Sequence, residues 1–126
     1  MTPLALQRMH NQFLAASHPG SLGELVCALG AVQGQDHQGT LWSLGLRMGG
    51  GLDQAQVEAG YAQPAGKATI VRSWVLRGTL HFVASGDLGW MVALLAPRLL
   101  NGEARRYREL ELDEATRRCS DKLLVK

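Results

Sequence analysis

The stretch VRSWVLRGTLHFV, residues 71–83, is the part of the sequence that decides the fold. β-Branched and aromatic side chains dominate it, and Gly78 separates its two halves. This composition favours extended backbone, most clearly over Thr79–Val83. The stretch therefore predicts a small β-hairpin, or wing, in a chain whose other segments have the apolar periodicity of helices.

Four helices are predicted before the hairpin. Pro3 suits a first helical turn. Ser21 and Glu24 form a capping box, in which the hydroxyl accepts from a free backbone N–H and the carboxylate reaches back. Asp53 can cap a short helix. The predicted helices cover residues 3–16, 22–29, 39–48 and 54–61.

Three helices are predicted after the hairpin. Ser85 or Asp87 is expected to cap a strongly apolar one, and Pro97 is expected near its end or at the start of the next. The last has no glycine, proline or cap before the final residue, which favours a chain that continues further. A frayed terminal helix is the alternative. The predicted helices cover residues 88–95, 99–110 and 113–126.

This order of elements predicts a fold that is mainly α with a small β-hairpin, in the α+β class. Three helices and a hairpin make the smallest winged-helix unit, although many small α+β domains share the same order. We therefore expect residues 1–126 to form a single winged-helix-like domain. We expect it to be the truncated N-terminal part of a multi-winged-helix protein.

The composition excludes several classes of protein. Of the 126 residues, 46% are hydrophobic and 19% are charged, as in a globular domain with one core. No apolar run is long enough to cross a bilayer, and the N-terminus lacks the apolar region of a secretory signal. We expect a cytoplasmic protein without a membrane partner. No cysteine or histidine pair has ligand spacing, so neither a metal nor another cofactor is expected.

The formal net charge is only +2, but the charges are unevenly distributed. Residues 1–97 hold five Lys or Arg and five Asp or Glu, whereas residues 98–126 hold eight and six. Arg105, Arg106 and Arg108 are candidate phosphate contacts in the second region. Acidic residues are interleaved with them, so a solvated helix face explains the charges as well.

A run of polar side chains, VQGQDHQ over residues 32–38, follows the second predicted helix. Glutamine has no pKa near neutrality, but its amide accepts a hydrogen bond through oxygen and donates through nitrogen. Gln33 and Gln35 can therefore orient a water molecule or read a base edge. Residues two apart share a side only on extended or irregular backbone, which Gly34 makes easier. The alternative is a polar helix end with solvated side chains.

Arg72, Arg77 and His81 flank the predicted strand. The arginines can contact DNA phosphates, and His81 can approach a substrate. In the alternative interpretation, one arginine caps a helix or pairs with Asp36, and His81 is a satisfied, half-buried residue.

The tryptophans are expected in the core. Trp42 and Trp90 lie in apolar helical patterns, which favours burial. In the structural interpretation of the hairpin, Trp74 and Phe82 pack inward as well.

Two segments, in this order and at this separation, resemble the AlkZ-like family of winged-helix DNA-binding proteins: LGAVQGQD at residues 29–36 and VRSWVLRGTLHFV at residues 71–83. Residues 106–108 and 112–116 are similar to the family as well. The resemblance extends over essentially the whole chain and covers the first third of a typical member. Several winged-helix units form a concave DNA-binding surface in such members, which implies double-stranded DNA as the partner.

Characterised members of this family are monofunctional DNA glycosylases that release alkylated purines, including crosslinked N7-alkylguanine. Their signature is a pair of glutamines, separated by one residue that is often apolar, that positions the attacking water. The resemblance implies this role for Gln33 and Gln35, with Gly34 between them. Asp36, by its adjacency, is a candidate for stabilising positive charge on the sugar. The alternatives are a non-catalytic winged-helix module, such as a regulator, and an inactive truncated product.

Overall fold

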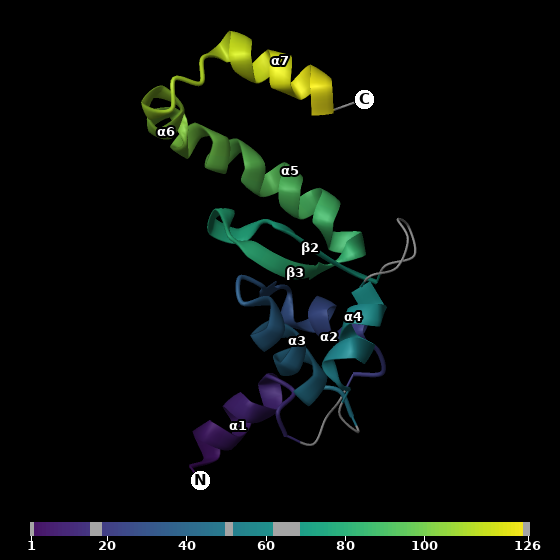
Figure 1. Cartoon of the computed structure of the whole chain (residues 1–126). Helices are drawn as coiled ribbons and strands as arrows, with labels where there is room; N and C mark the ends of the chain where they lie inside the picture. The colour runs from purple at the N-terminus through teal and green to yellow at the C-terminus, as the bar shows by residue number, and fades with distance from the viewer. Residues whose placement is uncertain (1, 16–18, 50–51, 62–68, 125–126) are drawn as a thin grey trace.

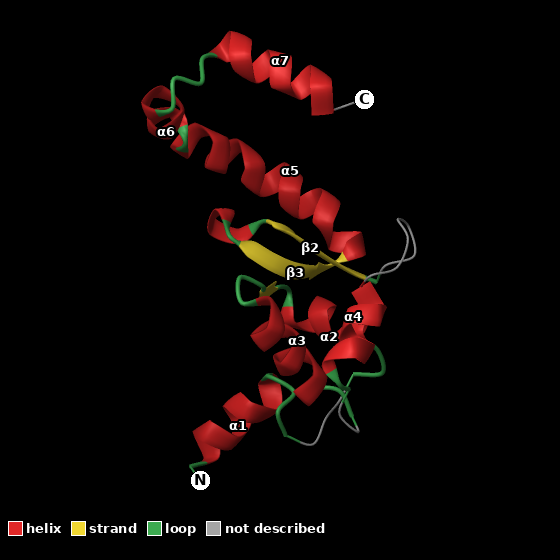
Figure 2. Cartoon of the chain, viewed as in Figure 1, coloured by secondary structure: helices red, strands yellow, loops and turns green. Residues whose placement is uncertain are grey.

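The computed structural model describes residues 2–15, 19–49, 52–61 and 69–124. Within them the chain forms seven α-helices, one 3₁₀ helix and a three-stranded antiparallel sheet (Figure 2). This confirms the α+β class with mostly helical content. The helices are α1 (Pro3–Asn11), α2 (Leu22–Leu29), α3 (His37–Leu46), α4 (Gln54–Tyr61), η1 (Leu76–Gly78), α5 (Ser85–Gly102), α6 (Ala104–Glu109) and α7 (Glu114–Leu124). The strands are β1 (Val32–Gln33), β2 (Ile70–Trp74) and β3 (Leu80–Ala84).

The sheet has the order β1-β3-β2, so that β3 lies in the middle. Strands β2 and β3 form the predicted hairpin, and η1 makes its tip. The short strand β1 was not predicted; it pairs antiparallel with β3, with Val32 opposite Phe82 and Gln33 opposite His81. The polar segment that follows α2 is therefore anchored to the centre of the sheet.

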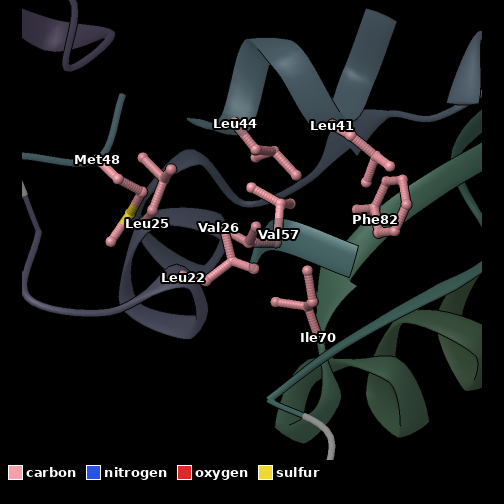
Figure 3. Close-up of a cluster of buried hydrophobic side chains, with 9 residues drawn as sticks. All are labelled: Leu22, Leu25, Val26, Leu41, Leu44, Met48, Val57, Ile70 and Phe82. Atoms are coloured by element: carbon pink, nitrogen blue, oxygen red, sulfur yellow. The ribbon is translucent and has the colours of Figure 1, made fainter. Parts of the chain in front are cut away.

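Helices cover both faces of the sheet (Figure 1). On one face α2, α3 and α4 enclose the larger core, where side chains from these helices meet β2 and β3 (Figure 3). On the other face α5 packs against a smaller core made by Val75, Val83 and Met91. The alternation along β3 explains this division, because Phe82 faces the larger core and Val83 faces the smaller one.

Helix starts follow the predicted chemistry closely. Ser21 and Glu24 form both hydrogen bonds of the capping box, which begins α2 at Leu22. The Asp53 carboxylate accepts from the backbone N–H of Gln56 at 2.8 Å, as expected of a cap of α4. Helix α3 begins two residues earlier than predicted, because Asp36 is its N-cap.

The predicted boundaries of several further helices are wrong. Helix α1 ends at Asn11, and Phe13 adopts a left-handed backbone with φ of 57°, which ends the helical pattern. Helix α5 has no side-chain cap and continues through Pro97 to Gly102. Leu95 packs on the smaller core and Leu99 lies against Gly78, so tertiary contacts on both sides of the proline maintain the helix. The predicted segment 99–110 is accordingly divided between α5 and α6 at Glu103.

The expectation that the tryptophans are buried is wrong. Trp42 is 60% exposed, Trp74 is 64% exposed and Trp90 is 54% exposed, whereas Phe82 is fully buried as expected. In α3 the buried face is made by Leu41 and Leu44 with their small neighbours. Trp42 follows Leu41 directly and therefore lies about 100° further around the helix, away from that face.

Among the described residues, no helix combines the length and the apolar character needed to cross a lipid bilayer. In the same part of the chain, no three histidine, cysteine or carboxylate side chains gather where they could hold a metal ion. Cys27 and Cys119 are free and exposed. The predicted end of the last helix, at residues 125–126, lies outside the described residues.

Candidate functional site

Gln33 and Gln35 lie side by side on the surface. The antiparallel ladder continues one residue beyond β1, because the Gly34 N–H donates to the Leu80 carbonyl at 2.8 Å. Gly34 is buried and both glutamines are exposed, as the alternation of extended backbone requires. The Gln33 Nε2 donates to the Gln35 Oε1 at 2.5 Å. The two side chains therefore meet the geometric condition for acting on one molecule.

Two side chains from other elements hold the backbone of this segment. Arg72 on β2 donates to the Gly34 carbonyl from both Nε, at 2.9 Å, and Nη2, at 2.7 Å. The Thr40 hydroxyl on α3 shares its proton between the carbonyls of Gln33, at 2.9 Å, and Asp36, at 2.5 Å. These hydrogen bonds fix the backbone carbonyls of Gln33, Gly34 and Asp36. A fixed backbone limits the positions that the two glutamine side chains can reach.

The Phe82 ring lies against Gly34, on the core side of the segment that carries the pair. A Cβ added to Gly34 would lie 3.1 Å from the Cδ2 of this ring, so glycine lets the extended segment approach the core closely. The Tyr61 ring packs edge-on against Phe82, with centroids 5.2 Å apart, and its hydroxyl lies 2.7 Å from the His37 Nε2. Desolvation raises the pKa of Tyr61, Glu58 raises it further and Arg72 opposes them. The phenol is therefore neutral near pH 7 and serves as a hydrogen-bonding group.

Asp36 lies at the rim of the site as the N-cap of α3. Its Oδ1 accepts from the Gly39 N–H at 3.0 Å. A Cβ on Gly39 would come within 2.3 Å of the other carboxylate oxygen, so the carboxylate lies directly over the first helical turn. Beyond this hydrogen bond, the two carboxylate oxygens have further lone pairs that can accept from a ligand.

These residues surround an open pocket of about 560 Å³. Trp42 lines it, and sequence reasoning missed this residue because it assigned the indole to the core. The signal that could have found it is the position of Trp42 directly after Leu41, outside the buried face of α3. The described lining residues are Val32, Gln33, Gln35, Asp36, Gly39, Thr40, Trp42 and Ser43.

The other predicted site residues of the hairpin occupy different environments. Arg77 lies at the exposed tip in η1, where its φ of 55° is left-handed. His81 is only 4% exposed, and its Nδ1–H donates to the Thr79 carbonyl at 2.9 Å. It lies between β1 and β2, opposite Gln33 and Ser73. His81 is thus hydrogen-bonded and more deeply buried than the half-buried histidine of the alternative interpretation. Among the described residues, Arg72 neither caps a helix nor pairs with Asp36, because its guanidinium donates to the Gly34 carbonyl.

The arginines of α6 lie apart from this pocket. The guanidinium groups of Arg105 and Arg106 pair with Glu109 at 2.8 and 3.3 Å, and both side chains are largely exposed. Such surface pairs are weak, so phosphates can compete for these arginines. Arg108 is exposed and lines another pocket, of about 500 Å³, together with Tyr107 and Arg117. Among the described residues, none of the three α6 arginines lines the pocket beside the glutamines.

Comparison with known proteins places this arrangement in a family. The family model "DNA glycosylase AlkZ-like" matches residues 26–124. No curated protein sequence matches the chain. Among solved structures, Streptomyces sahachiroi DNA glycosylase AlkZ matches with a TM-score of 0.58 and 24% identity, over 90% of this chain and 27% of that one. The chain thus spans 27% of the length of that structure, and the likeness concerns the fold. Because the family model covers most of the residues, the chain belongs to the AlkZ-like DNA glycosylase family.

Proposed function

We propose that this protein is a DNA glycosylase that hydrolyses the N-glycosidic bond of alkylated purines in double-stranded DNA. One observation carries the proposal: Gln33 and Gln35 are exposed, joined by a hydrogen bond, and placed on a pocket in a chain of a glycosylase family. We place this protein in the cytoplasm. The proposed reaction uses neither a metal ion nor another cofactor.

The amide pair is suited to hold a water molecule. Whichever way the two amides are turned, their mutual hydrogen bond uses one nitrogen and one oxygen. One oxygen and one nitrogen remain, so the pair can accept a hydrogen bond from water and donate another to it. Such a water is oriented by two fixed groups and needs only the sugar in place, which is the positional form of catalysis.

Hydrolysis of the N-glycosidic bond of an alkylated purine requires little beyond a positioned water molecule. N7 alkylation makes the base cationic, so the bond from C1′ breaks with its electrons going to the base, which leaves neutral. The sugar becomes positively charged, and the Asp36 carboxylate at the rim stabilises that charge. The held water then adds to C1′ and its proton passes to solvent. Neither glutamine has to change its protonation state in this sequence.

Release of N7-methylguanine from alkylated duplex DNA tests the proposal. Gln33→Ala and Gln35→Ala are each expected to lower the rate of release about 10²-fold, because each leaves the water with one support fewer. Both side chains are exposed, so the variants should keep the thermal transition of the wild type. Gln38→Ala is the matched control, since Gln38 is an exposed glutamine of α3 outside the pocket lining.

Two results would contradict the proposal. Wild-type rates in both glutamine variants would show that the pair does not hold the reacting water. Duplex binding without any base release by the wild type would favour the alternative, a non-catalytic DNA-binding module.

We also propose that residues 1–126 form one winged-helix-like domain, in which the described elements from α2 to β3 make the winged-helix unit. The order α2-β1-α3-α4-β2-β3, with β1 and β2 on the two sides of β3, supports this. The hairpin of β2 and β3 is then the wing, and Arg77 at its tip contacts a phosphate. The α6 residues Arg105, Arg106 and Arg108 are proposed as a second set of phosphate contacts.

Arg77→Ala is expected to weaken DNA binding uniformly across sequences. A phosphate contact contributes without reading bases, and its loss should reduce the slope of log affinity against log salt by about one. Fluorescence anisotropy with labelled duplexes over a range of salt concentrations measures both effects. Arg8→Ala on α1, which removes an exposed arginine from another part of the molecule, is the control. An unchanged slope in Arg77→Ala would remove the hairpin tip from the DNA interface.

A further inference from the structure

Trp42 exposes 60% of its surface at the pocket that holds the glutamine pair. Trp74 and Trp90 are exposed as well, so exposure alone does not distinguish Trp42, but Trp74 does not line this pocket. Trp90 differs, because its Nε1 donates to the Asp87 carboxylate at 2.8 Å on the surface of α5, and it does not line this pocket. The position of Trp42 therefore points to a ligand with a flat apolar face.

The charges around the pocket favour a cationic ligand over an anionic one. Of the described residues that line it, Asp36 is the one with an acidic side chain, and none is lysine or arginine. A phosphate would meet a like charge without a cation to bind it. A cationic ligand would meet the carboxylate and the negative face of the indole, to which cations are attracted.

We propose that Trp42 and Asp36 form a nucleobase subsite that selects a cationic, N-alkylated purine over a neutral one. The base stacks on the indole, and its positive charge lies near the carboxylate of the α3 N-cap. The pocket, about 560 Å³, is in the size range of sites for small ligands. The inference rests on the proposed function, since it places the substrate base beside the amide pair, but binding can be measured separately from base release.

The probes are two duplexes that differ at one position, which carries either N7-methylguanine or guanine on a 2′-fluoro sugar that resists base loss. Anisotropy titrations of the whole chain give the ratio of the two affinities. Wild type is expected to prefer the cationic base about tenfold, as a partly desolvated cation–π contact provides. Trp42→Ala should bring the ratio close to one, and Trp42→Phe should retain part of it.

Asp36→Asn separates charge from structure. Asparagine is an equally good N-cap, so α3 and the thermal transition should be preserved while the negative charge is lost. The preference for the cationic base is expected to fall several-fold in this variant. Trp90→Ala is the matched control for removing an exposed tryptophan, and its ratio should equal that of the wild type.

The outcomes distinguish the two proposals. Gln33→Ala should lose base release and keep the affinity ratio. A Trp42-dependent preference in a protein that releases no base would support the subsite and contradict the glycosylase proposal. A ratio near one in the wild type, or an unchanged ratio in folded Trp42→Ala, would overturn the subsite. Dissociation of a wild-type oligomer by Trp42→Ala, with the ratio intact, would overturn it in favour of a contact between copies.

Discussion

Phe82→Ala is expected to lower the free energy of unfolding by about 3–5 kcal/mol. Phe82 is fully buried in the larger core, on the central strand β3, where helices and both neighbouring strands meet (Figure 3). Its ring also supports the backbone of Gly34 and the ring of Tyr61. Truncation removes the transfer free energy of the ring and leaves a cavity that rigid neighbours cannot fill.

Urea unfolding followed by circular dichroism measures this loss. The control is Leu94→Ala, because Leu94 is 68% exposed and its truncation is expected to change stability by no more than about 0.5 kcal/mol. Phe82→Leu should retain more stability than Phe82→Ala, since it leaves a smaller cavity. A cost below about 1 kcal/mol for Phe82→Ala would contradict the position of this ring in the core.

Arg72→Ala is expected to lower base release about 10²-fold while leaving DNA affinity nearly unchanged. Its two hydrogen bonds to the Gly34 carbonyl hold the backbone between the glutamines, so their loss frees the amides to turn away from the substrate. Arg72 is thus a positioning residue. Arg72→Lys should be intermediate, because an ammonium group cannot reproduce the fork of two parallel N–H donors.

Kinetics and salt dependence together test this assignment. A positioning role predicts a fall in kcat, with the salt slope of duplex binding unchanged. A phosphate contact, the role inferred from sequence, predicts weaker binding and a slope reduced by about one, as expected for Arg77→Ala. A wild-type kcat in Arg72→Ala would show that the Gly34 carbonyl needs no such support.

Local signals predicted much of the fold. The capping box of Ser21 and Glu24, the cap at Asp53 and the β-prone residues after Ile70 each act within a few residues, and the structure has α2, α4 and the hairpin where they were expected. Strand β1 has only two residues and exists because β3 provides partners from a distant part of the chain. No periodicity can be read from so short a segment.

The sequence indicated which residues belong to the candidate site, but it indicated fewer of the contacts that hold them in place. The requirement that Gln33 and Gln35 need extended backbone to converge came from geometry alone, and the pairing with β3 satisfies it. The bonds from Arg72 and Thr40 join residues brought together only by folding. Hydrophobicity alone predicts burial of Trp42, whereas its angle around α3 places it on the surface.

Buried and exposed side chains alternate along residues 32–35 at the edge of the sheet, so substitutions in this segment have two different effects on stability. Val32 packs toward the larger core and Gly34 is buried, so substitutions at these positions are felt by the whole domain. The side chains at positions 33 and 35 are exposed, so substitutions there are expected to change stability by no more than about 0.5 kcal/mol. Evolution or a combinatorial library restricted to these two positions can therefore exchange one chemistry for another without a large loss of stability. A domain built in this way can diversify its reactions while its architecture persists.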